Sequence, residues 1–145
     1  MLKKSLFALF AVAIAFTAVA GEGPQHERHE LMEKVGKAAK PLGAMLKGEA
    51  EYDWATAEKS LHTFKKVSGK FGGLFPEGSD TGDTEAAPAI WEDREGFDQA
   101  LQEWADATAA ALEAAPATLE DAKPVLGGVF GTCKNCHDTY RIDED

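Results

Sequence analysis

The chain has 145 residues, with 15 lysines and arginines against 25 aspartates and glutamates, so its formal net charge at pH 7 is −10. This length is sufficient for one domain with a real hydrophobic core. The acidic balance argues against a nucleic-acid-binding protein, because such proteins hold phosphates with clustered lysines and arginines. An acidic surface favours solubility and association with basic partners instead.

The first 20 residues have the pattern of a secretory signal peptide. Two lysines near the start precede an almost unbroken apolar run at 5–16, and small residues follow at 18–20. The run is shorter than the about 20 apolar residues that a membrane-spanning helix needs. We therefore expect cleavage of residues 1–20, export to the periplasm, and one mature domain, residues 21–145, without a transmembrane segment.

Apolar residues spaced three and four apart predict four amphipathic helices, at about residues 26–47, 53–71, 88–115 and 118–140. The stretch between the second and third helices is rich in glycine, proline and aspartate, which is typical of a loop. It is long for a helix–helix connection, and a long crossover accommodates it. The sequence thus predicts an all-α fold, an antiparallel four-helix bundle.

Local residue chemistry marks several helix ends. Asp53 is a predicted N-cap of the second helix, and Thr118 with Asp121 three residues later resembles a capping pair at the start of the fourth. Gly48 is a predicted C-terminal stop for the first helix. Pro41 lies inside that helix, where it should cause a kink or a local break.

The two cysteines, Cys133 and Cys136, are three residues apart and would lie one turn apart on a helix. A structural disulfide, a thioredoxin-like redox pair and haem attachment are the competing interpretations of this pair. His137 follows directly, and C-x-x-C-H is the signature of c-type haem attachment. Two thiols on one turn can bond the two vinyl groups at one edge of the porphyrin, and the adjacent imidazole then lies beneath the iron. A zinc site is a weaker alternative, because no second Cys/His pair completes four ligands.

The whole mature chain resembles the class II c-type cytochromes, the cytochrome c prime family, in which the haem motif lies close to the C-terminus. The resemblance implies one covalently attached haem c held by the last helix of the bundle. It is carried by Arg28-His29-Glu30-Leu31-Met32, Leu74-Phe75-Pro76, Pro88-Ala89-Ile90-Trp91 and Cys133-Lys134-Asn135-Cys136-His137-Asp138-Thr139-Tyr140-Arg141.

The same resemblance implies a residue on the distal side of the iron, four positions after an arginine of the first helix. Here these positions are Arg28 and Met32. Family members with methionine at the distal position form a low-spin subgroup that uses its sulfur as sixth ligand, and Met/His ligation suits electron transfer. The resemblance further implies that Arg28 lies near a haem propionate and Arg141 near the proximal histidine.

We therefore expect a one-electron carrier, not an enzyme, with His137 and Met32 as axial ligands and redox partner proteins of unknown identity. One alternative is a high-spin protein of the cytochrome c prime kind that binds nitric oxide or carbon monoxide at an open distal site. Another is a peroxidase-like enzyme with His29 as distal base, and bis-histidine ligation through His26 or His29 also stays open. Relatives with this bundle often pair through their first two helices, so a homodimer is a further expectation.

Overall fold

The computed structural model describes residues 23–142, so the predicted signal peptide and its cleavage site lie outside the described residues. The described elements are α1 (Pro24–Lys47), α2 (Trp54–Phe71), the 3-10 turn η1 (Gly72–Leu74), α3 (Ala89–Glu92), α4 (Arg94–Ala114) and α5 (Leu119–Tyr140). Among these residues the only β pairing is an isolated antiparallel bridge between Ala86 and Arg141.

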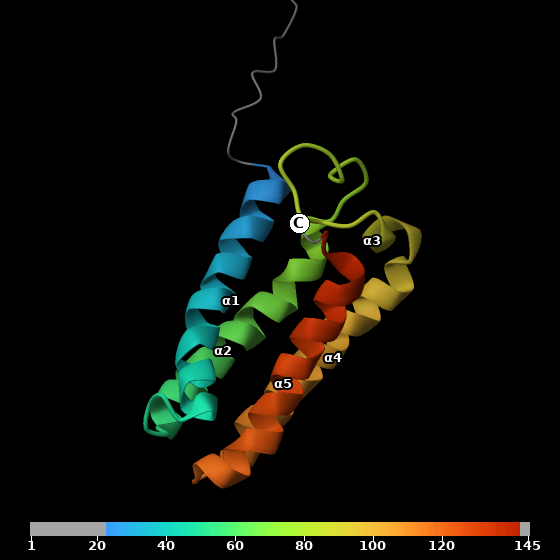
Figure 1. Ribbon diagram of the computed structural model, residues 1–145. Helices are drawn as coiled ribbons and strands as arrows, with labels where there is room; N and C mark the ends of the chain where they lie inside the picture. Colours follow the sequence, from blue (N-terminus) through green and yellow to red (C-terminus); the bar gives the residue numbers. More distant parts are fainter. Residues whose placement is uncertain (1–22, 143–145) are drawn as a thin grey trace, which may run out of the picture.

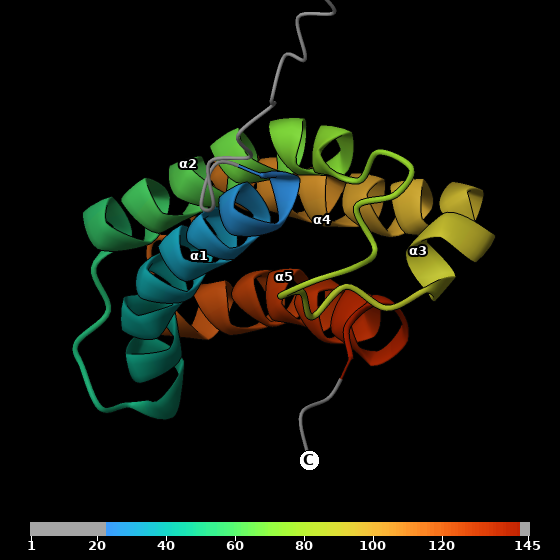
Figure 2. The same cartoon turned by 90° about the horizontal axis from the view of Figure 1, so that it is seen from above.

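Four long helices, α1, α2, α4 and α5, run up and down as an antiparallel bundle, which confirms the predicted fold class (Figure 1). The helices α1 and α2, α2 and α4, and α4 and α5 pack against each other, whereas α1 and α5 touch much less (Figure 2). The largest fully buried side chains between them are Phe64, Phe97, Leu42, Leu61, Ile90, Leu126 and Val129. No helix within 23–142 has both the length and the apolar character that crossing a bilayer requires.

The predicted helix ends are confirmed where local chemistry sets them. The Asp53 carboxylate accepts a hydrogen bond from the Thr56 amide at 2.9 Å, and Thr118 Oγ1 accepts one from the Asp121 amide at 3.2 Å. Gly48 ends α1 with a φ of 74°, a left-handed conformation that glycine adopts without strain. The helix continues through Pro41 without the break that the sequence allowed.

The third predicted helix differs from expectation, because it is interrupted at Asp93 and forms the short α3 and the long α4. The Asp93 side chain accepts a hydrogen bond from the Gly96 amide at 3.1 Å and so caps α4. Tyr140, at the end of α5, donates its hydroxyl to the same carboxylate at 3.2 Å. Its ring meets Phe97 edge-on, with centroids 5.3 Å apart. The start of α4 is therefore fixed by the last turn of α5.

The crossover between α2 and α4 is held against α1 by one buried arginine. Arg28 is 5% exposed, and its guanidinium donates to the Ser79 carbonyl at 2.7 Å and to Thr84 Oγ1 at 3.1 Å. The same group lies over the Phe75 ring, 4.7 Å from the centroid. Phe75 in turn packs edge-on against Phe97 at 4.8 Å. Arg28 thus joins α1 and the crossover to the aromatic core.

The close approach at Gly96 gives a stability prediction. A Cβ at this position would lie 2.5 Å from Tyr140 Oη and would also meet the Asp93 carboxylate. Gly96→Ala should therefore lower the free energy of unfolding by about 1–3 kcal/mol, the usual cost of overpacking, as measured by chemical denaturation. Gly69→Ala is the matched control, because a Cβ there meets nothing within 4 Å, and it should raise stability by about 0.5–1 kcal/mol. Equal effects of the two changes would contradict the packing argument.

The Arg28 contacts give a second prediction. Arg28→Lys keeps the charge but loses the planar fork, so it leaves acceptors of the crossover without their donor. We expect the free energy of unfolding to fall by about 1–3 kcal/mol and amide hydrogen exchange to speed up between residues 76 and 87. Lys40→Arg, on the exposed side of α1, should change neither quantity. Unchanged exchange in the crossover of the Arg28→Lys protein would show that other contacts hold this segment.

Candidate cofactor site

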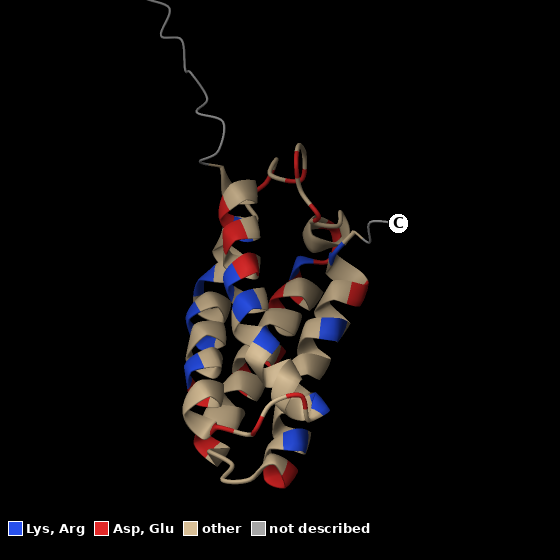
Figure 3. Cartoon of the chain, turned by 60° about the vertical axis from the view of Figure 1, so that its left-hand side comes forward, with Lys and Arg blue, Asp and Glu red and all other residues tan. Residues whose placement is uncertain are grey.

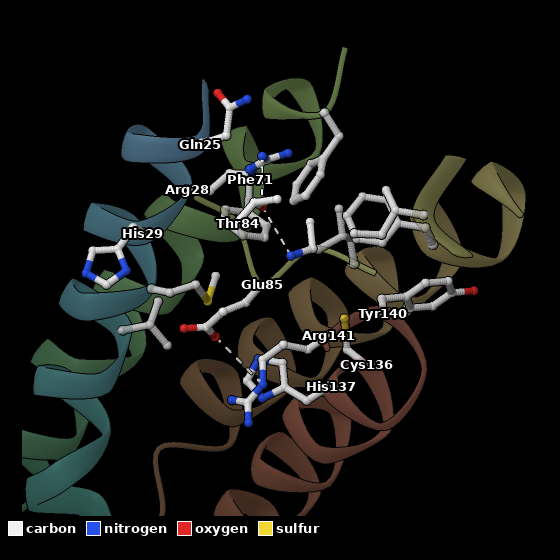
Figure 4. Close-up of a pocket in the computed structure, with 18 of the residues that line it drawn as sticks. Gln25, Arg28, His29, Phe71, Thr84, Glu85, Cys136, His137, Tyr140 and Arg141 are labelled. Atoms are coloured by element: carbon white, nitrogen blue, oxygen red, sulfur yellow. Dashed lines mark hydrogen bonds and ion pairs between the residues drawn. The ribbon is translucent and has the colours of Figure 1, made fainter. Parts of the chain in front are cut away.

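A cavity of about 790 Å³ lies at the end of the bundle that carries the crossover, with α1 and α5 among its walls (Figure 4). Its volume falls within the range of about 300–1,000 Å³ that is typical of ligand and cofactor pockets. All six site residues predicted from the sequence line this single cavity. They are Arg28, Met32, Cys133, Cys136, His137 and Arg141.

The α5 wall carries the attachment motif on one helical face. Cys133, Cys136 and His137 are half-buried and lie in the last two turns of α5. Positions three and four apart on a helix are neighbours, so the two sulfurs and the imidazole lie on the same side. Figure 4 shows Cys136 and His137 on the α5 wall beside Tyr140 and Arg141.

No disulfide joins Cys133 and Cys136 in the part of the chain that the structure describes, which argues against the disulfide interpretation. Burial raises the pKa of the Cys133 thiol, and burial with the neighbouring Cys133 raises the pKa of Cys136 to about 11. A thioredoxin-like pair needs a thiol with a lowered pKa. The redox-pair interpretation is therefore disfavoured by the environment of both sulfurs.

This donor set fits a haem. Thiols that bond the vinyl groups and an imidazole that binds the iron occupy one wall of a largely apolar cavity. A metal held by protein side chains alone is not indicated, because no group of three His, Cys, Asp or Glu residues within 23–142 could ligate one. The cavity could accept a planar cofactor between α1 and α5, anchored by Cys133 and Cys136 and ligated by His137.

The α1 wall carries three residues at helical spacing, His29, Met32 and Val35. Met32 and Val35 are half-buried, and His29 is exposed at the rim. Met32 therefore borders the space opposite the α5 wall, where the resemblance placed a distal residue. Met45 is buried in the core and is not among the residues that line the cavity. His26 also lines the rim, with its Nε2 3.7 Å from a Glu30 carboxylate oxygen.

The structure gives Arg28 a different main contact from the predicted propionate. Its terminal nitrogens donate to Ser79 and Thr84 of the crossover, and burial lowers the pKa of its guanidinium. The Arg28 Nε is also buried and has no hydrogen-bond partner among the described residues. A haem propionate that contacts Arg28 would accept a hydrogen bond from this Nε or share the terminal nitrogens with Ser79 and Thr84. The predicted propionate contact stays a prediction.

Arg141 lines the same cavity as His137, and its predicted place near the proximal histidine stays a prediction. It lies just beyond the helix with extended φ and ψ of −116° and 139°. Its backbone pairs with Ala86 of the crossover, and its Nε lies 3.9 Å from a Glu85 carboxylate oxygen. Figure 4 shows the Glu85 side chain directed from the crossover toward Arg141, close to His137.

Sequence reasoning missed the crossover residues of this site. Ser79 and Thr84 hold Arg28, and Glu85 faces Arg141. All three lie in a stretch that is recognisable from the sequence only as a loop. The burial of Arg28 and Ser79 is visible only in the structure, and nothing local to residues 79–85 indicates which helix they contact.

Comparisons with known proteins show the family to which the chain belongs. A family model described as Cytochrome C' matches residues 24–141. A cytochrome c' of Rhodopseudomonas palustris is 44% identical over 119 residues, 79% of each chain. A cytochrome c-556 of Agrobacterium fabrum is 35% identical over 128 residues, 86% of this chain and 85% of the relative. These matches do not confirm the predicted low-spin, methionine-ligated subgroup.

A solved structure of cytochrome c' from Rhodopseudomonas palustris superposes with a TM-score of 0.81 at 41% identity, covering 84% of this chain and 98% of that one. The agreement extends over the whole four-helix bundle and its haem-bearing helix. Such relatives are cytochromes, not classical enzymes. The chain therefore belongs to the cytochrome c' family and is a c-type cytochrome with one covalently attached haem c.

Proposed function

We propose that this chain is a periplasmic haem protein of the cytochrome c' kind that takes up nitric oxide or carbon monoxide on the distal side of its haem. In this proposal Cys133 and Cys136 would anchor the haem through thioether bonds, and His137 would ligate its iron. The haem supplies an iron atom that can bind a diatomic gas. The observation that carries the proposal is that the α1 residues Met32 and Val35, both apolar, line the cavity that also holds Cys133, Cys136 and His137 of α5.

The relatives support this choice over the electron carrier expected from the sequence. The relative at 44% identity and the structure at TM-score 0.81 are both cytochromes c'. A cytochrome c prime from Alcaligenes xylosoxidans, 28% identical with a TM-score of 0.73, has been solved as the nitric oxide complex of a mutant. None of these relatives supports His/Met ligation for this chain, and we therefore favour the gas-binding protein over the low-spin carrier.

The chain's own residues would serve this function by shaping the space around the iron. Met32 and Val35 present apolar atoms to the distal side, which favours a small uncharged ligand over a charged one. His29 is exposed at the rim, so among the described residues of α1 no buried carboxylate or imidazole lines the cavity. Tyr140 and Arg141 hold the end of α5 through Asp93 and Ala86, which fixes the direction of His137.

A His/Met electron carrier is the second candidate. The specific observation in its favour is that Met32 lines the same cavity as His137, from another helix. A methionine thioether is a known axial ligand of haem iron in cytochromes. The two candidates differ in one testable property, namely whether a sixth ligand from the protein occupies the distal position.

The visible spectrum of the holoprotein tests the proposal. We expect a broad high-spin ferric spectrum, and a reduced form that changes at once on addition of carbon monoxide or nitric oxide. Met32→Leu keeps the volume of the side chain and removes the sulfur, so the spin state should not change. Met45→Leu is the matched control, because it makes the same chemical change outside the cavity.

A low-spin wild-type spectrum would contradict the proposal if Met32→Leu turned it high-spin while Met45→Leu did not. That result would establish the second candidate instead. A low-spin spectrum unchanged by Met32→Leu would contradict both candidates and direct attention to His26 and His29 as ligands.

A further inference from the structure

The charges of the chain are segregated between its two halves. Residues 24–71, which contain α1 and α2, carry nine lysines and arginines against seven acidic residues, a net charge of +2. Residues 72–142 carry four basic residues against fourteen acidic ones, a net charge of −10. Figure 3 shows lysine and arginine positions along the helices on the side that holds α1, while Asp and Glu mark the loops at both ends of the bundle. The α1–α2 pair is thus a basic surface on an acidic protein.

A groove of about 510 Å³ runs between α1 and α2 on this basic side. Leu31 and Val67 form its apolar floor, and both are 3% exposed. Its walls carry four lysines together with His62 and Thr63. The four are Lys34, Lys59, Lys66 and Lys70. We call these four residues the lysine cluster.

The positive charge of the lysine cluster is only partly neutralised within the chain. Lys34 lies 3.5 Å from Glu30 and Lys70 lies 3.6 Å from Glu27, both as exposed ion pairs. Such exposed pairs are weak and exchange readily with other partners. Among the described residues, Lys59 and Lys66 form no ion pair with any carboxylate.

The groove lies on the other side of α1 from the haem cavity. Leu31 and Lys34 line the groove, and Met32 and Val35, their direct neighbours in sequence, line the cavity. The two spaces are therefore separated by a single helix, about 10 Å in diameter with its side chains. A molecule seated in the groove would contact the helix that forms the distal wall.

We propose that this groove is the docking site for an acidic surface segment of a partner protein. Complementary charge on opposite surfaces steers association and fixes its register. The cluster extends from Lys59 to Lys70 along α2, about 16 Å at 1.5 Å per residue, which exceeds the size of a single phosphate or carboxylate ion. The groove is also concave, a shape that matches a protruding segment better than a flat bilayer surface. The inference does not depend on which ligand the iron takes.

A second copy of the chain fits this groove less well. A two-fold interface repeats the same patch on both subunits, so pairing through α1 and α2 across the groove would bring two lysine clusters together. Within 23–142, the only large hydrophobic residue that is exposed is Ile142, which lies beyond α5. The homodimer through the first two helices stays a prediction, and the basic groove argues against it.

Titration of the holoprotein with poly-L-glutamate at low ionic strength tests the docking site. Lys59→Glu with Lys66→Glu should raise the dissociation constant at least about tenfold, because two attractive contacts become repulsive. The matched control is Lys40→Glu with Lys123→Glu, which changes the net charge equally at exposed positions outside the groove. It should cost much less affinity. Lys59→Gln with Lys66→Gln provides a milder version, and the visible spectrum of each variant verifies an intact haem site.

Four results would overturn the proposal. The first is that the wild type does not bind poly-L-glutamate, and the second is that the two charge-reversed pairs lose equal affinity for it. The third is tighter binding to phosphatidylglycerol vesicles than to poly-L-glutamate. The fourth is salt-sensitive self-association of the wild type that the Lys59→Glu, Lys66→Glu variant abolishes. The second would mean that only net charge matters. The third would identify a membrane surface and the fourth a second copy of the chain. None of these results depends on the spin state or gas binding, so the proposed function can fail or stand separately.

Discussion

The position of the crossover over the haem cavity depends on the hydrogen bonds of Arg28. One guanidinium joins α1 to Ser79 and Thr84 and lies on the ring of Phe75. Burying a charged group is costly unless it is hydrogen-bonded, and here the bonds and the aromatic face offset that cost. Because the crossover is fixed at Ser79 and Thr84, the residues that follow can pair with Arg141 at the end of α5. The two walls of the cavity are thereby linked through one loop, although α1 and α5 themselves touch little.

The sequence was informative wherever a property is local to one helix. The caps at Asp53 and Thr118 follow from a side chain that reaches an amide three residues away, and the attachment motif follows from thiols and imidazole on one turn. The break at Asp93 was not predictable in the same way, because Tyr140, 47 residues away, shares its carboxylate. The pairing of Arg141 with Ala86 was likewise not predictable, since it belongs to the tertiary structure and nothing local to either residue indicates it.

Met32 marks the boundary between what spacing predicts and what it does not. Its distance along the helix from Arg28 correctly predicts that both side chains line one cavity. Whether the sulfur bonds the iron is decided by the separation of α1 from α5, which the crossover and the core packing set together. The residue type at the distal position is therefore insufficient to assign the spin state.

Net charge is a similarly incomplete guide to partners. The overall value of −10 predicted basic partners, yet it averages a basic α1–α2 pair with a strongly acidic remainder. Screening shortens electrostatic interactions to about 8 Å at physiological ionic strength, which is less than the width of a helix with its side chains. An approaching protein therefore responds to the face that it meets, and on the α1–α2 side that face is the lysine cluster. Because the same helix α1 also lines the haem cavity, the surface most suited to an acidic partner lies directly behind Met32 and Val35, which face that cavity.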